Sequence, residues 1–277
     1  MGGSGLSLSL AFWLGLSQGI SELFPFSSLG ILVVLPHTLG IPFNQNGARY
    51  LPFVVALHVG TALALLLYFR KTWVRLIGGW FRWLGGHRNQ DGWLLWVIIV
   101  ATIPAGLAGL LLKHKLAPLF VAPRLAAIFL VVNAGVLMVG ERWRKRSRPN
   151  VRLRDLSLGQ AIKVGLYQMF ALIPGLSRDG LSMTGGLGQG LFMEEAARLA
   201  FLMATPIIGA AALLELPRLL HHGMATLRTP ALVGGLTAGV VAWLSTHYLL
   251  RYFQRGGLAG LAAISFAIGV LSLALVH

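Results

Sequence analysis

Three carboxylates lie inside long apolar stretches of a chain that has only 8 acidic residues in 277, namely Glu22, Asp179 and Glu215. An ionisable side chain at the depth of a bilayer costs roughly 2.5–3.5 kcal/mol on insertion scales, so such residues mark candidate functional sites. Two of the three stand among other polar residues that interrupt the apolar pattern. Near Glu22 these are Gln18, Ser27 and Ser28, and near Asp179 they are Ser177 and Arg178.

Together these residue types suit a phosphate group. Arg178 offers a planar fork of donors that matches phosphate oxygens, and the serines offer hydroxyls. Glu22 follows Gln18 by four residues, which places both side chains on one face of a helix. Glycines beside the serines, including Gly175 and Gly180, permit tight turns whose backbone N–H groups can cup an anion. The set predicts a phosphoryl site that uses a divalent metal.

Structural roles compete with these assignments. Arg178 could pair with Asp179 or with Glu22 as a buried ion pair that only holds the fold together. Glu215 lies near the end of an apolar segment with an arginine three residues on, which favours an ion pair at a helix end. His58 is alone on an apolar face, the usual setting of a core histidine whose hydrogen bonds are satisfied. Its place soon after the first polar cluster keeps it a candidate.

The two polar clusters belong to a repeat with an offset of 150 residues. Gly15-Leu16-Ser17-Gln18 corresponds to Gly165-Leu166-Tyr167-Gln168, and Ser27 and Gly30 correspond to Ser177 and Gly180. Each copy has a proline just before its serine. Interrupted apolar segments at matching places in two halves indicate a central site in an inverted-repeat membrane protein.

Composition agrees with a membrane protein. The chain is 56% hydrophobic and 11% charged, whereas soluble domains are about 25% charged. The formal net charge of +15 lies between the apolar segments, where the positive-inside bias and anionic lipid account for it, so we expect no nucleic acid partner. The absence of cysteine excludes disulfides and thiolate chemistry.

Eight apolar segments predict an all-α polytopic membrane fold in one integral membrane domain, residues 1–277. Segments 8–35 and 160–192 exceed the roughly 20 residues of one span and contain Pro25 and Pro174, so we predict two re-entrant helical hairpins, each entering and leaving on one side. The six predicted transmembrane helices are 50–69, 94–112, 125–140, 196–217, 229–249 and 258–276. Repeat one covers about 8–140, repeat two about 160–277, and a basic cytoplasmic linker, 141–159, joins them.

The distribution of lysine and arginine predicts the orientation. Loops 70–92, 141–159 and 250–257 carry 14 basic residues, and the loops on the other side carry 6. The positive-inside rule therefore puts the first three in the cytoplasm and both termini outside. The two repeats then have opposite orientations, as inverted repeats require.

At these residues the chain resembles the undecaprenyl-pyrophosphate phosphatase, or bacitracin-resistance, family. One family signature is Glu/Gln-x-x-x-Glu followed by Pro-x-Ser-Ser-Thr-Gly-His, and residues 18–31 here read QGISELFPFSSLGI. The other signature is Pro-Gly-x-Ser-Arg-Ser-Gly, and residues 174–180 read PGLSRDG. The resemblance covers nearly the whole chain and implies six transmembrane helices plus two re-entrant hairpins in inverted-topology repeats.

The resemblance also implies a function and a site. The family removes the terminal phosphate of undecaprenyl pyrophosphate at the outer face of the bacterial cytoplasmic membrane, which recycles the lipid carrier of cell-wall synthesis. Ser27 would be the nucleophile or a phosphate ligand, Arg178 would clamp the phosphates, and Glu22 with Gln18 would hold a divalent metal, Mg²⁺ or Ca²⁺, or orient the nucleophile. The remaining expected substrate-binding residues are Ser28, Ser177, Gly175, Gly180, Asp179 and His58. The expected partners are a polyprenyl pyrophosphate lipid and the bilayer, with a homodimer as an open assembly state.

Three positions depart from the family pattern. Ile31 stands where the family has histidine, Leu29 where it has threonine, and Asp179 where it has serine. General acid–base help is typically worth 10²–10⁴-fold, and isoleucine cannot supply it. His58 and Asp179 are the candidates to compensate. Asp179 would act as a base or metal ligand, or else pair with Arg178.

The inverted repeats and the missing histidine keep a second function open. A flippase or transporter for a polyprenyl phosphate, or a catalytically impaired lipid-binding homologue, needs to bind phosphate through Arg178 and Ser177 and needs no nucleophile. A purely structural membrane scaffold would leave the buried polar cluster unexplained.

Overall fold

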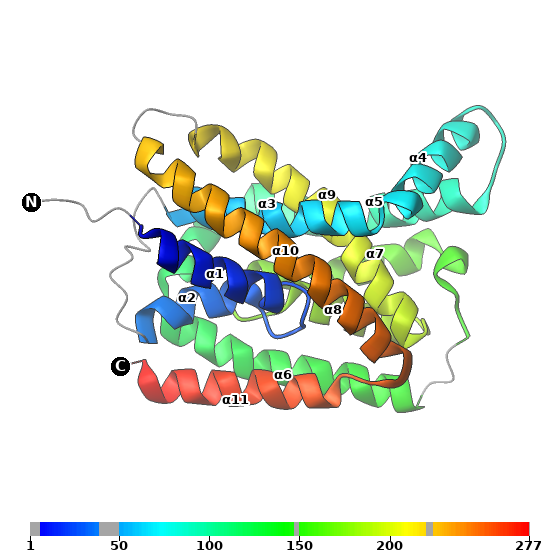
Figure 1. Cartoon of the computed structure of the whole chain (residues 1–277). Coiled ribbons are helices and arrows are strands. Elements are labelled where there is room, and N and C mark those ends of the chain that lie inside the picture. The colour runs from blue at the N-terminus through cyan, green and yellow to red at the C-terminus, as the bar shows by residue number, and fades with distance from the viewer. Residues whose placement is uncertain (1–5, 39–49, 147–149, 220–223, 277) are drawn as a thin grey trace, which may run out of the picture.

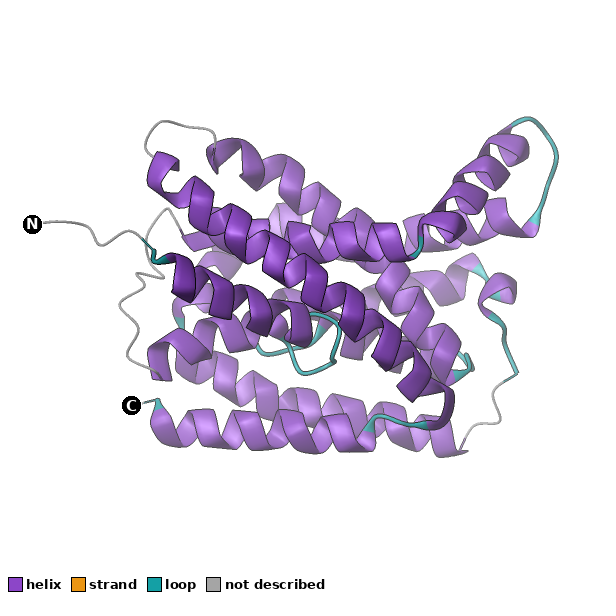
Figure 2. Cartoon of the chain, in the orientation of Figure 1, coloured by secondary structure: helices purple, strands orange, loops and turns teal. Residues whose placement is uncertain are grey.

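The computed structural model describes residues 6–38, 50–146, 150–219 and 224–276. Helices α1 to α11 make up nearly all of these residues, and no strand occurs among them (Figure 2). The bounds are α1 Leu8–Ser21, α2 Ser28–Thr38, α3 Tyr50–Tyr68, α4 Arg70–Leu84, α5 Gln90–Leu116, α6 Pro123–Arg146, α7 Leu158–Met169, α8 Arg178–Gly188, α9 Met193–Leu219, α10 Ala225–Arg255 and α11 Ala259–Leu275. Short 3₁₀ turns lie at Ala117–Val121, Leu153–Asp155 and Phe170–Leu172.

Five of the described helices are long and apolar enough to cross a membrane. They are Leu51–Tyr68, Gln90–Leu112, Pro123–Arg146, Met193–Leu214 and Ala225–Arg255. They coincide with five of the predicted spans and confirm the all-helical polytopic class. The sixth predicted span forms α11, whose 17 residues extend about 25 Å along α6 (Figure 1). That α11 crosses the membrane stays a prediction.

Both long apolar segments are broken near their prolines. Proline cannot donate to the helical ladder and pushes the residue before it out of helical geometry. The first segment ends one helix at Ser21 and starts the next at Ser28, with Pro25 between them. The second breaks around Pro174 and Gly175, whose φ of +101° is readily adopted only by glycine.

Each broken segment doubles back, and the two do so from opposite ends of the bundle. In Figure 1, α1 runs from one end to the middle and α2 returns to that end, whereas α7 and α8 do the same from the other end. The loops between the paired helices meet near the centre (Figure 2). This is the predicted pair of helical hairpins with opposite entry. That they re-enter the membrane rather than cross it stays a prediction.

The two halves exchange packing partners through repeat-related glycines. α1 lies against α10 of the second half, and α7 lies against α5 of the first. A Cβ at Gly15 would clash with the Gly234 carbonyl oxygen, and one at Gly165 would clash with the Ala101 carbonyl oxygen. Small residues at such crossings let helix backbones approach closely. The repeated glycine therefore allows a close helix–helix contact in each half.

The basic segment 70–92 is not simply a loop, as its charge suggested, because Arg70–Leu84 forms helix α4. Thr72, Leu76 and Gly79 recur at helical spacing and are buried, while the arginines lie on the other faces. α4 packs on α5 at a close approach between Gly79 and Gly92. The predicted linker also starts inside a helix, since α6 continues to Arg146. The count of basic residues took no account of the amphipathic pattern of α4 or of the basic residues at the end of α6.

Candidate active site

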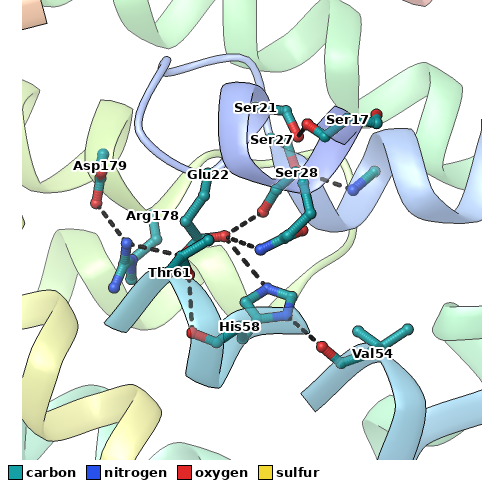
Figure 3. Close-up of polar contacts among 12 residues, drawn as sticks. Ser17, Ser21, Glu22, Ser27, Ser28, Val54, His58, Thr61, Arg178 and Asp179 are labelled. Carbon is teal, nitrogen blue, oxygen red and sulfur yellow. Dashed lines mark hydrogen bonds and ion pairs between the residues drawn. The ribbon is translucent and has the colours of Figure 1, made fainter. Parts of the chain in front are cut away.

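The carboxylate of Glu22 is the centre of a buried polar cluster at the meeting point of the hairpins (Figure 3). Its Oε1 accepts a hydrogen bond from Arg178 Nη2 at 3.0 Å. Its Oε2 accepts from Gln18 Nε2 at 2.8 Å and from Ser28 Oγ at 2.6 Å, and lies 3.3 Å from His58 Nε2. Four helices, α1, α2, α3 and α8, each bring one partner to this group. The structure therefore brings Gln18, Glu22, Ser28, His58 and Arg178 together in space.

Arg178 forms ion pairs with both Glu22 and Asp179, and one of its guanidinium nitrogens, Nη1, takes part in neither. Its Nη2 lies 3.0 Å from Glu22 Oε1 and 2.9 Å from Asp179 Oδ1. Nη1 is buried and has no hydrogen-bond partner within the described chain. A guanidinium oriented by two carboxylates, with a second nitrogen unpaired, can receive a phosphate oxygen without giving up either pair.

The two serines of the first hairpin have different surroundings. Ser28 Oγ donates to Glu22 at 2.6 Å, the contact that a carboxylate base makes with a hydroxyl. Ser27 Oγ donates to the carbonyl of Leu176 at 3.1 Å and accepts from Gly30 N at 3.2 Å. Ser27 also has φ +66°, an unusual value for a residue with a side chain. Ser27 joins the hairpin tips, and Ser28 faces the carboxylate.

Two N–H groups of the predicted anion cup, those of Gly30 and Gly180, are bonded to serine hydroxyls. Ser177 Oγ accepts from Gly180 N at 3.1 Å, which caps α8 as Ser27 caps the start of α2. Gly180 packs against Leu137 and Pro25, and a Cβ at Gly175 would clash with the Ala126 carbonyl oxygen. Ser177, Gly175 and Gly180 therefore shape the hairpin and its packing rather than face the carboxylate.

The repeat explains why two dissimilar side chains face Glu22 from opposite hairpins. With the offset of 150, Ser28 corresponds to Arg178, the first residue of α8, and Glu22 corresponds to Leu172. Equivalent helix starts therefore point at one carboxylate that only the first repeat carries. The fold is nearly symmetric, but the chemistry is not.

Asn133 on α6 is a residue that the sequence analysis missed. Its Nδ2 donates to the Pro25 carbonyl at 2.8 Å and to Ser265 Oγ at 3.0 Å, and its Oδ1 accepts from Ser177 N at 2.9 Å. It is fully buried, and it ties both hairpin tips to α6 and α11. A lone amide within an apolar span was the available signal, since unpaired polar groups at membrane depth are costly.

The donor set at this point fits a divalent cation. Gln18 Oε1 is buried with no hydrogen-bond partner among the described residues, and Glu22 Oε1 has a single hydrogen-bond donor, Arg178. Mg²⁺ takes oxygen ligands, keeps several waters and often uses one or two protein groups together with substrate phosphates. No cluster of three His, Cys, Asp or Glu residues occurs within the described part of the chain. A cation here would therefore depend on oxygens of the substrate.

Other features lie apart from this cluster. A groove of about 840 Å³ runs over α3, α9 and α10, and its walls are almost entirely apolar apart from Arg228. None of the residues around Glu22 lines it. The side chain of Glu215 lies outside the described residues, so its predicted helix-end pair is not tested.

Comparison with known proteins agrees with the geometry. The sequence profile described as "Bacitracin resistance protein BacA" matches residues 11–271. The chain belongs to this family. It is 46% identical over 269 residues to "Undecaprenyl-diphosphatase 2" of Burkholderia lata, covering 97% of this chain and 96% of the relative. It is also 46% identical over 274 residues to "Undecaprenyl-diphosphatase" of Acidiphilium cryptum, covering 96% and 97%. The predicted family is confirmed.

Replacing Asn133 with leucine tests whether the hairpin tips depend on its amide. The change leaves the Pro25 carbonyl and the Ser177 N–H unpaired in the protein interior, and each such group costs about 1–3 kcal/mol. We expect the melting temperature in detergent to fall by about 5 °C or more.

The matched control is Thr246→Val, which removes a buried hydroxyl bonded only to the carbonyl of Ala242 in its own helix. We expect this variant to melt close to the unmodified protein. An Asn133→Leu protein that melts within about 1 °C of the control would show that the amide does not hold the tips.

Proposed function

We propose that the protein is a membrane phosphatase that hydrolyses undecaprenyl pyrophosphate, or a related polyprenyl pyrophosphate, to the monophosphate. The observation that carries the proposal is the contact of one carboxylate, Glu22, with both a hydroxyl and an arginine that has a free arm. The family and the names of its relatives support the same activity. The proposed role is carrier-lipid recycling for cell-wall synthesis.

In the proposed reaction, Ser28 is the nucleophile rather than Ser27. Its Oγ gives its proton to Glu22 and forms a bond to the terminal phosphorus, while the bond from that phosphorus to the bridging oxygen breaks. The polyprenyl monophosphate leaves with the bridging oxygen. Glu22 passes this proton to the bridging oxygen as the monophosphate leaves, so the carboxylate is free again. Water then attacks the phosphorus of the phosphoserine. Glu22 takes a proton from this water and returns it to the serine oxygen as that oxygen leaves, which releases inorganic phosphate and restores the Ser28 hydroxyl.

Arg178 would bind the transferred phosphate and stabilise its developing negative charge. Its Nη1 would hold an oxygen of the transferred phosphate while Nη2 stays on the two carboxylates. Donors fixed before the reaction stabilise developing charge without reorganisation. A divalent cation, Mg²⁺ or Ca²⁺, held by Gln18 and Glu22 together with the substrate would neutralise charge on the pyrophosphate oxygens.

We further propose that the protein lies in the bacterial cytoplasmic membrane with this site open to the outer side. The bias of 14 basic residues against 6 supports this orientation. In Figure 1, the α10–α11 turn and the α4–α5 turn lie at one end of the bundle, and the start of α1 and the end of α11 lie at the other. The grouping of the ends agrees with the charge-based topology.

Purified protein in detergent should release phosphate from undecaprenyl pyrophosphate. EDTA should stop the release, and added Mg²⁺ or Ca²⁺ should restore it. Arg178→Ala should lower kcat/KM by about 10²-fold or more, the loss typical of a removed charge-stabilising donor. Lipid that binds without turnover in the unmodified protein would instead favour a carrier or sensor.

Separate alanine variants of the two serines distinguish their roles. Ser28→Ala removes the proposed nucleophile, so phosphate release should fall by about 10²-fold or more when the variants are compared at equal folded fraction. Ser27→Ala removes the bond to the Leu176 carbonyl, so the melting temperature should fall while much of the activity remains in the folded fraction. The reverse pattern would assign the nucleophile to Ser27.

A further inference from the structure

His58 is the one partner of Glu22 that comes from a helix outside the hairpins. Its Nε2 lies 3.3 Å from Glu22 Oε2, the same oxygen that accepts from Ser28. The first turn of α2 offers no imidazole of its own, because Ile31 stands three residues after Ser28, on the same face of the helix. The imidazole that reaches the carboxylate therefore comes from α3.

The orientation of the His58 ring is fixed by its other nitrogen. Nδ1 lies 2.8 Å from the carbonyl oxygen of Val54, one turn earlier in α3. A carbonyl oxygen only accepts, so Nδ1 carries a hydrogen and the ring edge with Nε2 faces Glu22. Figure 3 shows the imidazole between Val54 and the carboxylate. Because Glu22 has to be ionised to take the proton of Ser28, the hydrogen of this contact lies on Nε2, which donates to Oε2.

We infer that His58 is a positioning residue that holds the Glu22 carboxylate with Oε2 on Ser28. The inference rests on the proposed function. Arg178 donates to Oε1, while Gln18 and His58 contact Oε2 from α1 and α3, so the carboxylate cannot turn away from the hydroxyl. The side chain of His58 is 19% exposed. The protein around it therefore restricts movement of the ring away from Glu22.

Two substitutions separate positioning from proton transfer. His58→Gln keeps an N–H donor near the place of Nε2 and cannot take up a proton at neutral pH, whereas His58→Leu keeps bulk and loses the donor. Positioning predicts that the glutamine variant keeps kcat within about threefold, and that the leucine variant loses about 10- to 100-fold in kcat, the range for a hydrogen bond to a charged group. KM should change little in either variant, because Arg178 still binds the phosphate.

The matched control is Thr61→Val, one turn further along α3. Among the described residues, the Thr61 hydroxyl donates only to the backbone carbonyl of His58, at 2.8 Å, so kcat and melting temperature should stay near those of the unmodified protein. All variants are compared at equal folded fraction, measured by melting temperature and gel filtration in detergent.

Each result of this series bears on the inference. A leucine variant with unchanged kcat, or a glutamine variant as impaired as the leucine variant, overturns the positioning role while the proposed phosphatase stands. Unmodified protein that releases no phosphate overturns the proposed function and this inference with it. A leucine variant that loses kcat, beside a glutamine variant that keeps it, supports the inference.

Discussion

The fold requires hydrogen-bond partners for the backbone N–H and C=O groups at two helix breaks in the middle of an apolar bundle. Unpaired N–H and C=O groups at that depth cost several kcal/mol each, so non-helical backbone persists there only when protein or water completes its hydrogen bonds. Here the backbone groups at the two breaks find hydrogen-bond partners in the opposite hairpin and in Asn133. Ser27 Oγ reaches the Leu176 carbonyl, and Asn133 bonds both the Pro25 carbonyl and the Ser177 N–H. The cluster around Glu22 exists because these tips are held at one point.

The repeat supplies this meeting point, and the departures from it supply the chemistry. Gly15 and Gly165 let each hairpin pack on a helix of the other half, which places the two tips together at the centre. Ser28 and Arg178 are equivalent positions that approach Glu22 from opposite hairpins. The position equivalent to Glu22 is Leu172, so a second copy of the site cannot form. The two halves therefore have similar folds, but only the first carries the carboxylate of Glu22.

Much of this arrangement could be predicted from the sequence, because the strongest signals are those that a membrane exposes. A carboxylate in an apolar segment, as at Glu22, is costly and therefore conspicuous, and so are prolines inside segments too long for one span. Those signals predicted that Gln18, Glu22, Ser28 and Arg178 belong to one site, with His58 as a separate candidate. Features that depend on neutral side chains or on the backbone were not predicted. Asn133 carries no charge, and the arginines of α4 made its segment look like a loop.

The roles of the adjacent serines also depended on three-dimensional structure. Ser27 and Ser28 are identical in type, and only the left-handed backbone at Ser27 decides which hydroxyl faces Leu176 and which faces Glu22. A sequence pattern fixes neither a positive φ at serine nor the carbonyl that happens to lie nearby. The glycines of the second hairpin are similar, since the N–H of Gly180 is taken by Ser177 and so does not face an anion.

The central claim is that the two hairpin tips touch, and a cross-link tests it most directly because the chain contains no cysteine. A Cβ at Gly180 would lie 3.2 Å from the Pro25 Cβ, close to the roughly 3.5–4.5 Å of a disulfide. Pro25→Cys with Gly180→Cys, and a protease site between Arg146 and Asn150, should give halves that stay joined after oxidation and cleavage and separate on reduction. Pro25→Cys with Gly106→Cys is the control, since nothing lies within 4 Å of a Cβ at Gly106. Halves of the Pro25–Gly180 pair that separate without reduction would contradict the account.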